Sequence, residues 1–402
     1  MTEPGTESAF LLTGCEVVLP DRVIRRGAVL VDEGRILFAG SEDRLPIWRP
    51  EGCRTIPANG LRACPSLWET HIHGCGGVST ESMTPESLTR MAEFLAGKGV
   101  GAFVPTIVSD EHHIEALGSA IESVRGNPGV LGRILGIHVE GPFVSSARRG
   151  AIPAELLREP SIEYLDRMVR ISRGSIRILT VAPELSGSRE VIDRLRSTGI
   201  LPSLGHSDAA YDSLRDYEGI VPLGVTHLFN GMSGVSHKDP GLAQWALLSR
   251  TAYTELNCDG THVHDAAVRL TLQIRPWDRV VAISDAVAPA GLLPEQPVGS
   301  LYGRQLAARG TGLFYADTGV LVGSRCLVPD TLARLVSEFK VPVARAVAMV
   351  TLNPARLLGF ERKGALLPGY DADLALFSHD FSHCSLLCWE GRSVFESLSA
   401  SA

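Results

Sequence analysis

Residues 61–73, LRACPSLWETHIH, form an apolar run, and residues 84–99, TPESLTRMAEFLAGKG, follow it with a different pattern of polar and apolar residues. The second segment predicts a helix, because Thr84 suits the N-cap, Pro85 suits the first turn, and glycines close the segment. The apolar run that precedes this helix predicts a core strand. Together the two segments predict one βα unit.

The same alternation recurs along the chain. Seven further apolar runs predict core strands, most of them separated by segments long enough for a helix: GAFVPTIV (101–108), RILGIHVE (133–140), IRILTVAPE (176–184), LPSLGHS (201–207), VPLGVTHLF (221–229), YTELNCDG (253–260) and RVVAISDA (279–286). Eight βα units favour a (β/α)8 TIM barrel, an α/β fold, over an open doubly wound sheet.

The two ends of the chain differ from this central part. Residues 10–60 contain β-branched runs broken by Gly, Asp and Pro, and short strands return from about residue 356 in GALLPGYDADLALF and CWEGRSVF. We therefore expect residues 1–62 and 356–402 to combine into one small β-sandwich domain. Residues 63–355 are then expected to form the barrel.

Composition narrows the class of protein. The 402 residues are 45% hydrophobic and 21% charged, with a net charge of −7 and no run of Lys or Arg, so neither nucleic acid nor a membrane surface is an expected partner. The N-terminus lacks a signal-peptide pattern, and no stretch reaches the roughly 18 consecutive apolar residues of a membrane helix. Eight scattered cysteines without CxxC spacing predict reduced thiols in a cytoplasmic protein. Cys384 and Cys388 are read as two apolar thiols and not as metal ligands.

Ionisable side chains stand at the C-terminal ends of the predicted strands: His71, His73, Glu140, His206, His227 and Asp285. In a TIM barrel these strand ends form the mouth of the active site, and the two histidines of an HxH pair face the same side of a strand. One such histidine alone is more often a satisfied polar residue than a ligand. Four imidazoles and two carboxylates together predict a site for first-row metals, in which a carboxylate can bridge two ions. We expect His138 to pack or to support a ligand instead of binding metal.

Ten motifs make the chain recognisable: CPSLWETHIHGCGG, VPTIVSD, LGIHVEGPF, VAPE, GHSDA, THLFNGM, KDPGLA, DGTHV, ISDAVAPAG and GYDADLALF. In this order they resemble the N-acetylglucosamine-6-phosphate deacetylases of the amidohydrolase superfamily, nearly end to end. The resemblance implies metal-dependent hydrolysis of the N-acetyl amide of N-acetylglucosamine-6-phosphate, which yields glucosamine-6-phosphate and acetate. Its small-molecule partner is thus an amino-sugar phosphate.

The resemblance also assigns roles at the strand ends. Glu140, His206 and His227 match the principal metal ligands, and Asp285 matches the catalytic aspartate, which we also count among the metal positions. Family members that keep both histidines of the HxH pair hold two metals, so the pair at 71 and 73 implies two divalent ions with Glu140 as the bridge. Imidazole and carboxylate ligands suit Zn, Fe, Mn or Co.

Substrate contacts are implied by the same comparison. Asn230, Gly231 and His262 match positions that contact the sugar phosphate, and Lys238 stands where the family has a phosphate-binding Arg. Lysine supplies a point charge without the bidentate fork of arginine. The family suggests a homodimer in which Lys238 serves the neighbouring subunit's site. Arg148 or Arg149 either compensates for the fork lost at position 238 or carries surface charge. In addition, Ile152 stands where the family has a His that holds the acetyl carbonyl.

The sequence leaves three functional hypotheses open. The first is deacetylation of N-acetylglucosamine-6-phosphate, in which metal lowers the pKa of bound water towards about 7 and Asp285 moves the proton to the leaving amine. The second is hydrolysis of a different N-acyl amino sugar or amide, motivated by Ile152 and Lys238. The third is a non-catalytic binding protein on the same fold, against which the intact set of six site residues weighs.

Overall fold

The computed structural model describes residues 9–108, 110–127, 130, 133–293 and 298–397. The chain divides into two compact units. One unit comprises residues 1–68, 93–102 and 328–402, and the other comprises residues 69–92 and 103–327.

Eight parallel strands form a barrel in the spatial order β15-β14-β13-β12-β11-β10-β9-β6. Their bounds are β6 Leu67–Ile72, β9 Val100–Val108, β10 Ile137–Glu140, β11 Ile176–Val181, β12 Leu201–Leu204, β13 Gly224–Val225, β14 Tyr253–Asn257 and β15 Val280–Ile283. A parallel bridge between Ile72 and Ala286 links the two edges, so the barrel is nearly closed. The strands are buried almost throughout, which explains why they read as continuous apolar runs.

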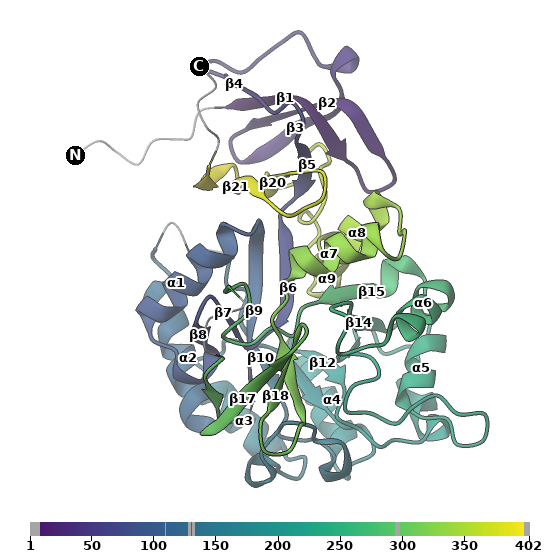
Figure 1. Cartoon of the computed structure of the whole chain (residues 1–402). Coiled ribbons are helices and arrows are strands. Elements are labelled where there is room, and N and C mark those ends of the chain that lie inside the picture. The colour runs from purple at the N-terminus through teal and green to yellow at the C-terminus, as the bar shows by residue number, and fades with distance from the viewer. Residues whose placement is uncertain (1–8, 109, 128–129, 131–132, 294–297, 398–402) are drawn as a thin grey trace. The chain divides into compact units, whose positions relative to one another are not determined.

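Helices alternate with these strands and lie around the barrel (Figure 1). They are α1 Pro85–Ala96, α2 Glu111–Val124, α3 Ile162–Ile171, α4 Ser188–Ser197, α5 Leu242–Leu248 and α6 Asp265–Ile274. The predicted cap of α1 is present, because the Oγ1 of Thr84 accepts a hydrogen bond from the backbone N–H of Ser87 at 3.2 Å. In α2 the buried residues recur at positions 114, 117 and 121, the spacing of one helical face.

A small antiparallel sheet follows the last barrel strand. Its strands are β16 Ser300–Leu301, β17 Arg304–Arg309, β18 Gly312–Tyr315 and β19 Leu321–Ser324, paired in that order. Leu306, Leu313, Tyr315 and Val322 pack on Val287 as its own apolar cluster. Two further short strands, β7 Gly74–Cys75 and β8 Val78–Ser79, pair with each other.

The two ends of the chain share one sheet of the other unit, with purple N-terminal and yellow C-terminal strands in Figure 1. The order is β22-β21-β20-β5-β1-β2-β3, with β4 paired to β1. The bounds are β1 Phe10–Val18, β2 Val23–Asp32, β3 Arg35–Ser41, β4 Arg54–Pro57, β5 Arg62–Pro65, β20 Leu374–Phe377, β21 Cys384–Trp389 and β22 Arg392–Glu396. Its core combines residues from both ends, including Leu12, Val29, Ile36 and Leu374. Helices α7 Val328–Ser337, α8 Val343–Met349 and α9 Leu352–Leu357 belong to the same unit.

The fold class expected from sequence is confirmed: a TIM barrel with a small β-domain built from both termini. All eight predicted strands are present, although several end earlier than the apolar runs suggest. β12, for example, ends at Leu204 and leaves His206 in the loop beyond it. The expected domain boundaries, at residues 62/63 and 355/356, stay a prediction.

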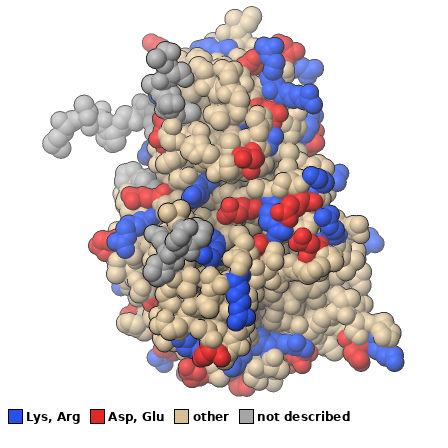
Figure 2. Space-filling model, in the orientation of Figure 1, with Lys and Arg blue, Asp and Glu red and all other residues tan. Residues whose placement is uncertain are grey.

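None of the eight cysteines, all of which lie in the described residues, forms a disulfide. Figure 2 shows acidic and basic side chains interspersed over the visible face, without an extended area of one sign. Within the described residues, none of the helices combines the length and hydropathy that crossing a membrane requires.

Candidate active site

The carboxylate of Glu140, at the end of β10, is the centre of a polar cluster in the barrel. Its Oε1 lies 2.9 Å from the Nε2 of His206 and 2.8 Å from the Nε2 of His227. Its Oε2 lies 3.1 Å from the Nε2 of His73, and its Oε1 lies 3.6 Å from the Nε2 of His71. Four imidazoles from three strand ends therefore direct the same ring nitrogen at one acidic group.

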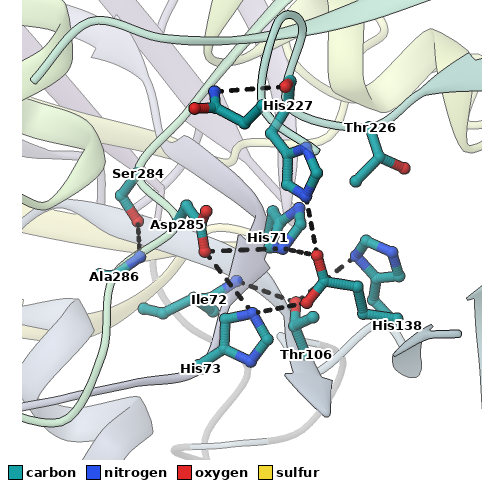
Figure 3. A network of polar contacts seen from close by, with 12 residues as sticks. His71, Ile72, His73, Thr106, His138, Thr226, His227, Ser284, Asp285 and Ala286 are labelled. Carbon is teal, nitrogen blue, oxygen red and sulfur yellow. Dashed lines mark hydrogen bonds and ion pairs between the residues drawn. The ribbon is translucent and has the colours of Figure 1, made fainter. Parts of the chain in front are cut away.

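Asp285, which follows β15, faces the HxH pair from another side (Figure 3). Its Oδ1 lies 3.5 Å from the Nε2 of His73 and 3.7 Å from the Nε2 of His71. Its Oδ2 lies 3.2 Å from the Nε2 of His262, whose Nδ1 lies 2.7 Å from the Oδ2 of Asp259. The ring of His262 is thus held between two carboxylates.

Contacts at the Nδ1 atoms of His206 and His71 determine that the Nε2 atoms of these two rings face Glu140. The Nδ1 of His206 lies 2.9 Å from the backbone oxygen of Arg148, and the Nδ1 of His71 lies 3.0 Å from the Oε2 of Glu255 in β14. Because a carbonyl oxygen only accepts, His206 donates from Nδ1 to Arg148, and this bond turns its Nε2 towards Glu140. A histidine oriented in this way is prepared to bind a cation.

Burial and the histidines act in opposite directions on the acids. Burial alone would raise the pKa of Glu140, but hydrogen bonds from neighbouring histidines hold it well below its ordinary value. The same opposition lowers the pKa of Asp285, where nearby histidine charge outweighs burial. For His262, burial would lower the pKa, but hydrogen bonds with Asp259 and Asp285 raise it to about 9. Both acids in the cluster are therefore ionised at neutral pH.

The backbone at three cluster residues is left-handed, with φ of 48° at His206, 28° at His227 and 52° at Asp285. Residues other than glycine seldom adopt this conformation, and such strain concentrates at functional sites. Gly231 is also left-handed, and a Cβ atom there would lie 2.8 Å from the Nδ1 of His206. The loop after β13 thus approaches His206 as closely as glycine permits.

A cavity of about 230 Å³ opens onto this cluster. Its polar lining is His73, Glu140, His206, His227, Asn230, His262, Asp285 and Tyr302, and its apolar lining includes Val108, Ile152, Leu301 and Val322. A larger hollow of about 590 Å³ lies beside α2 and α3, but the described residues that line it include no carboxylate or imidazole. The chemistry of this chain therefore lies in the smaller cavity.

The donor set fits a divalent metal. Among the described residues the Nε2 of His71 is buried without a hydrogen-bond partner, and the Nε2 atoms of His206 and His227 lie only 3.1 Å apart. Two imidazole lone pairs at that distance repel each other unless a cation or a proton lies between them. Potential ligand atoms of His71, Glu140 and His227 lie within 4.8 Å of one another, as do those of His71, His73 and Asp285.

The sequence-predicted substrate residues fall into two groups. Asn230, Gly231 and His262 line the cavity, and so does Ile152, which packs with Val108. Lys238 lies in an exposed loop and is not part of the described cavity lining. Within this chain the structure thus brings together all of the proposed ligands and three of the four proposed substrate contacts.

Sequence reasoning missed two residues around the site, Glu255 and Tyr302, and anticipated a third, His138. Glu255 contacts His71 and also accepts a hydrogen bond from the backbone N–H of His227 at 3.2 Å. A carboxylate inside the apolar run YTELNCDG was a signal that could have found it. His138 is buried, and its Nε2 lies 2.9 Å from the Oγ1 of Thr180, which agrees with a packing or supporting role. Tyr302, in a turn of the added sheet, carried no such signal.

Comparison with known proteins places this geometry in a family. Residues 315–394 match the Amidohydrolase family. The chain is 34% identical to N-acetylgalactosamine-6-phosphate deacetylase of Escherichia coli O157:H7, covering 77% of this chain and 82% of that protein. It is 32% identical to N-acetylglucosamine-6-phosphate deacetylase of Bacillus subtilis, covering 98% of each chain. The chain belongs to the N-acetylglucosamine-6-phosphate deacetylase family.

Solved structures agree with this assignment. The chain is similar to N-acetyl-D-glucosamine-6-phosphate deacetylase of Mycobacterium smegmatis in complex with N-acetyl-D-glucosamine-6-phosphate, with a TM-score of 0.85 and 26% identity over 96% of this chain and 100% of that one. As an amidohydrolase with this cluster, the chain is a hydrolytic enzyme that uses a divalent metal. The hypothesis of a non-catalytic binding protein is therefore set aside.

Proposed function

We propose that this enzyme hydrolyses the N-acetyl amide of N-acetylglucosamine-6-phosphate, releasing acetate and glucosamine-6-phosphate. The observation that carries the proposal is the convergence of four imidazoles on Glu140, with Asp285 beside the HxH pair and a cavity next to them, in a chain 32% identical to a deacetylase of that substrate over nearly its full length.

Two divalent ions are part of this proposal. Glu140, His206 and His227 would hold one ion, while His71, His73 and Asp285 would hold the other, with Glu140 as a bridge. The burial and proximity of these donors support the assignment, and Zn, Fe, Mn and Co all suit imidazole and carboxylate ligands. Such ions, when bound, supply Lewis-acid activation of water and of the amide carbonyl.

The chain's own residues handle the proton. The Asp285 carboxylate is ionised and reaches the cavity, so it can accept a proton from the attacking water and return it to the departing amine nitrogen. The Nε2 of His262, 3.2 Å away, donates to the Oδ2 of Asp285 and fixes the direction of that carboxylate. Asp259 in turn accepts from the Nδ1 of His262 at 2.7 Å, so the ring cannot rotate freely.

A second substrate is favoured by a specific observation. The relative with 34% identity acts, by its name, on N-acetylgalactosamine-6-phosphate. That sugar carries the same reacting amide and the same phosphate, so the cluster around Glu140 would serve it equally well. The cavity beside Asn230 and His262 would have to distinguish the two sugars.

Lys238 is proposed to bind the substrate's phosphate across a homodimer interface. The protein has a net charge of −7, so a phosphate dianion needs a local cation. Lys238 is exposed and lies outside the described lining of its own cavity, which supports a role at a neighbouring subunit's site. We also propose a cytoplasmic location, because eight free thiols suit a reducing compartment.

One kinetic comparison tests these proposals. We expect kcat/KM to be higher for N-acetylglucosamine-6-phosphate than for N-acetylglucosamine. Lys238→Ala should raise KM for the phosphorylated sugar and leave the unphosphorylated one unchanged, whereas Lys238→Arg should preserve phosphate binding. A wild-type preference for the unphosphorylated sugar would refute the phosphate assignment and favour a different N-acyl substrate.

A further inference from the structure

Tyr302 is a polar residue of the cavity that the proposed reaction leaves without a role. It lies in the turn between β16 and β17, where its φ is 48°, and it lines the cavity together with Leu301. It also packs against the buried cluster formed by Val108, Val144 and Ile152. Tyr302 therefore places a phenol on an otherwise aliphatic wall of the cavity.

The other polar side chains that line the cavity already have partners. The histidines and the two carboxylates contact one another. The amide nitrogen of Asn230 donates to the backbone oxygens of His227 and Leu228, at 3.3 and 3.4 Å. Tyr302 is the remaining polar side chain among the described residues of the lining, and its hydroxyl interacts with Glu81, which is not part of that lining. A ligand can therefore hydrogen-bond to this hydroxyl without breaking the contacts among the histidines and the two carboxylates.

The surroundings of Tyr302 keep its proton in place. Burial raises the pKa of Tyr302 well above its ordinary value, and the negative charge of Glu81 adds to the rise. Burial likewise raises the pKa of Glu81, against the opposing effect of the backbone N–H and the hydroxyl of Tyr302. A hydroxyl has one proton and two lone pairs, so Tyr302 can face Glu81 and still hydrogen-bond a ligand.

We propose that Tyr302 is a substrate-positioning residue whose hydroxyl hydrogen-bonds to the acylamino group of the bound amino sugar, an inference that rests on the proposed function. To react, this group must lie beside Asp285 and Glu140, which share the cavity with Tyr302. An acetamido group combines a methyl with a polar amide. The wall of Val108, Ile152 and Tyr302 matches it, because it is aliphatic apart from one hydroxyl.

The proposed role of Tyr302 also explains how the cavity wall can have an apolar side chain at position 152. The side chain at position 152 has no hydrogen-bonding group, yet it lies on the cavity wall beside Tyr302. The hydroxyl of Tyr302 supplies the polar contact that an isoleucine at this position cannot make.

The test removes only the hydroxyl. Tyr302→Phe keeps the ring that packs on Ile152, and we expect kcat/KM for N-acetylglucosamine-6-phosphate to fall about fivefold, the effect of losing one neutral hydrogen bond. The matched control is Tyr315→Phe, because Tyr315 lies on the neighbouring strand β18, is buried, and donates to the backbone oxygen of Ala151 at 3.4 Å. We expect the control to stay within twofold of wild type.

A second pair of variants separates a hydrogen bond from packing. Ile152→His adds a polar ring to the same wall, so we expect it to restore activity at least threefold in the Tyr302→Phe background and to give less gain in wild type. Equal effects of Ile152→His in both backgrounds, or a Tyr302→Phe enzyme within twofold of wild type, would overturn the inference. If the wild-type enzyme does not turn over the sugar phosphate, the proposed function fails instead. The role of Tyr302 is then decided by calorimetric Kd values for the sugar phosphate: weaker binding by Tyr302→Phe than by wild type supports it, and equal binding overturns it.

Discussion

Replacing Gly231 by alanine should damage the metal site through one hydrogen bond. The new Cβ would lie 2.8 Å from the Nδ1 of His206 and 3.0 Å from the backbone oxygen of Arg148. These two atoms form the 2.9 Å hydrogen bond that directs the Nε2 of His206 at Glu140. The methyl group therefore inserts at the contact that orients a proposed ligand.

The Gly231→Ala substitution has two separable effects, one on metal affinity and one on folding stability. An ordinary contact needs about 3.4 Å, so the ring must retreat by about 0.6 Å from its 2.8 Å position. Losing the outer hydrogen bond of a ligating histidine costs about 10–100-fold in metal affinity. Separately, the left-handed φ of 54° costs an alanine about 1–2 kcal/mol of folding stability. Gly199→Ala is the matched control, because Gly199 has a φ of 75° and open space around its Cβ.

The assay is metal affinity measured by competition with a chelator, without substrate, beside thermal unfolding. We expect both variants to lose a similar amount of stability, and Gly231→Ala alone to bind metal at least tenfold more weakly than wild type. A Gly231→Ala protein that binds metal as tightly as Gly199→Ala would refute the reasoning, because it would show that the bond from His206 to Arg148 does not orient a ligand.

Three further predictions concern the same chain. Asp285→Asn should lower kcat by about 10²–10⁴-fold while sparing substrate affinity, and a variant with more than a tenth of wild-type kcat would exclude Asp285 as the proton carrier. The double variant His71→Asn, His73→Asn should reduce metal content from two ions to one, as measured by elemental analysis, and one ion or fewer in fully active wild type would contradict the two-ion site. Burial raises the pKa of Cys15 and Cys384 to about 12, so at pH 9 maleimide should label them only after unfolding. Unfolded thiols ionise near pH 8.5, whereas these two thiols stay protonated in the folded protein, so the free energy of unfolding should fall as the pH rises above about 8.5. A free energy of unfolding that stays constant up to pH 10 would contradict this prediction.

Much of the fold could be predicted because barrel strands are buried on both faces. Such strands appear as short apolar runs, and eight of them alternated with helical segments. Their ends were less predictable. β13 is only Gly224–Val225, although the run VPLGVTHLF continues to Phe229, because the chain turns left-handed at His227 and Phe229 to present the imidazole. Function here overrides the local apolar pattern.

The ligand cluster could be predicted because its residue types are unusual at strand ends. Six ionisable side chains after buried runs have few structural explanations, and the structure brings all six together, with four histidines around Glu140 and Asp285 beside two of them. Glu255 also follows from sequence in retrospect, since a carboxylate within a buried strand needs a partner, which His71 provides at 3.0 Å.

The wall of the cavity could not be predicted in the same way. Strands β16 to β19 lie in the connection after the eighth barrel strand and add Leu301, Tyr302 and Val322 to the lining. These strands are short and partly exposed, so neither the periodicity nor the hydrophobicity of the sequence predicts them. A tyrosine in a tight turn reads as an ordinary surface residue until tertiary packing places it against Ile152.

The central claim is metal-dependent deacetylation at the Glu140 cluster. The most direct measurement is acetate release from N-acetylglucosamine-6-phosphate by protein purified without chelator, repeated after chelation and after adding back a divalent metal, with metal content determined in each sample. The account predicts about two ions per chain with turnover, loss of turnover as metal is removed, and recovery when metal returns. Undiminished turnover by the metal-free protein would contradict it.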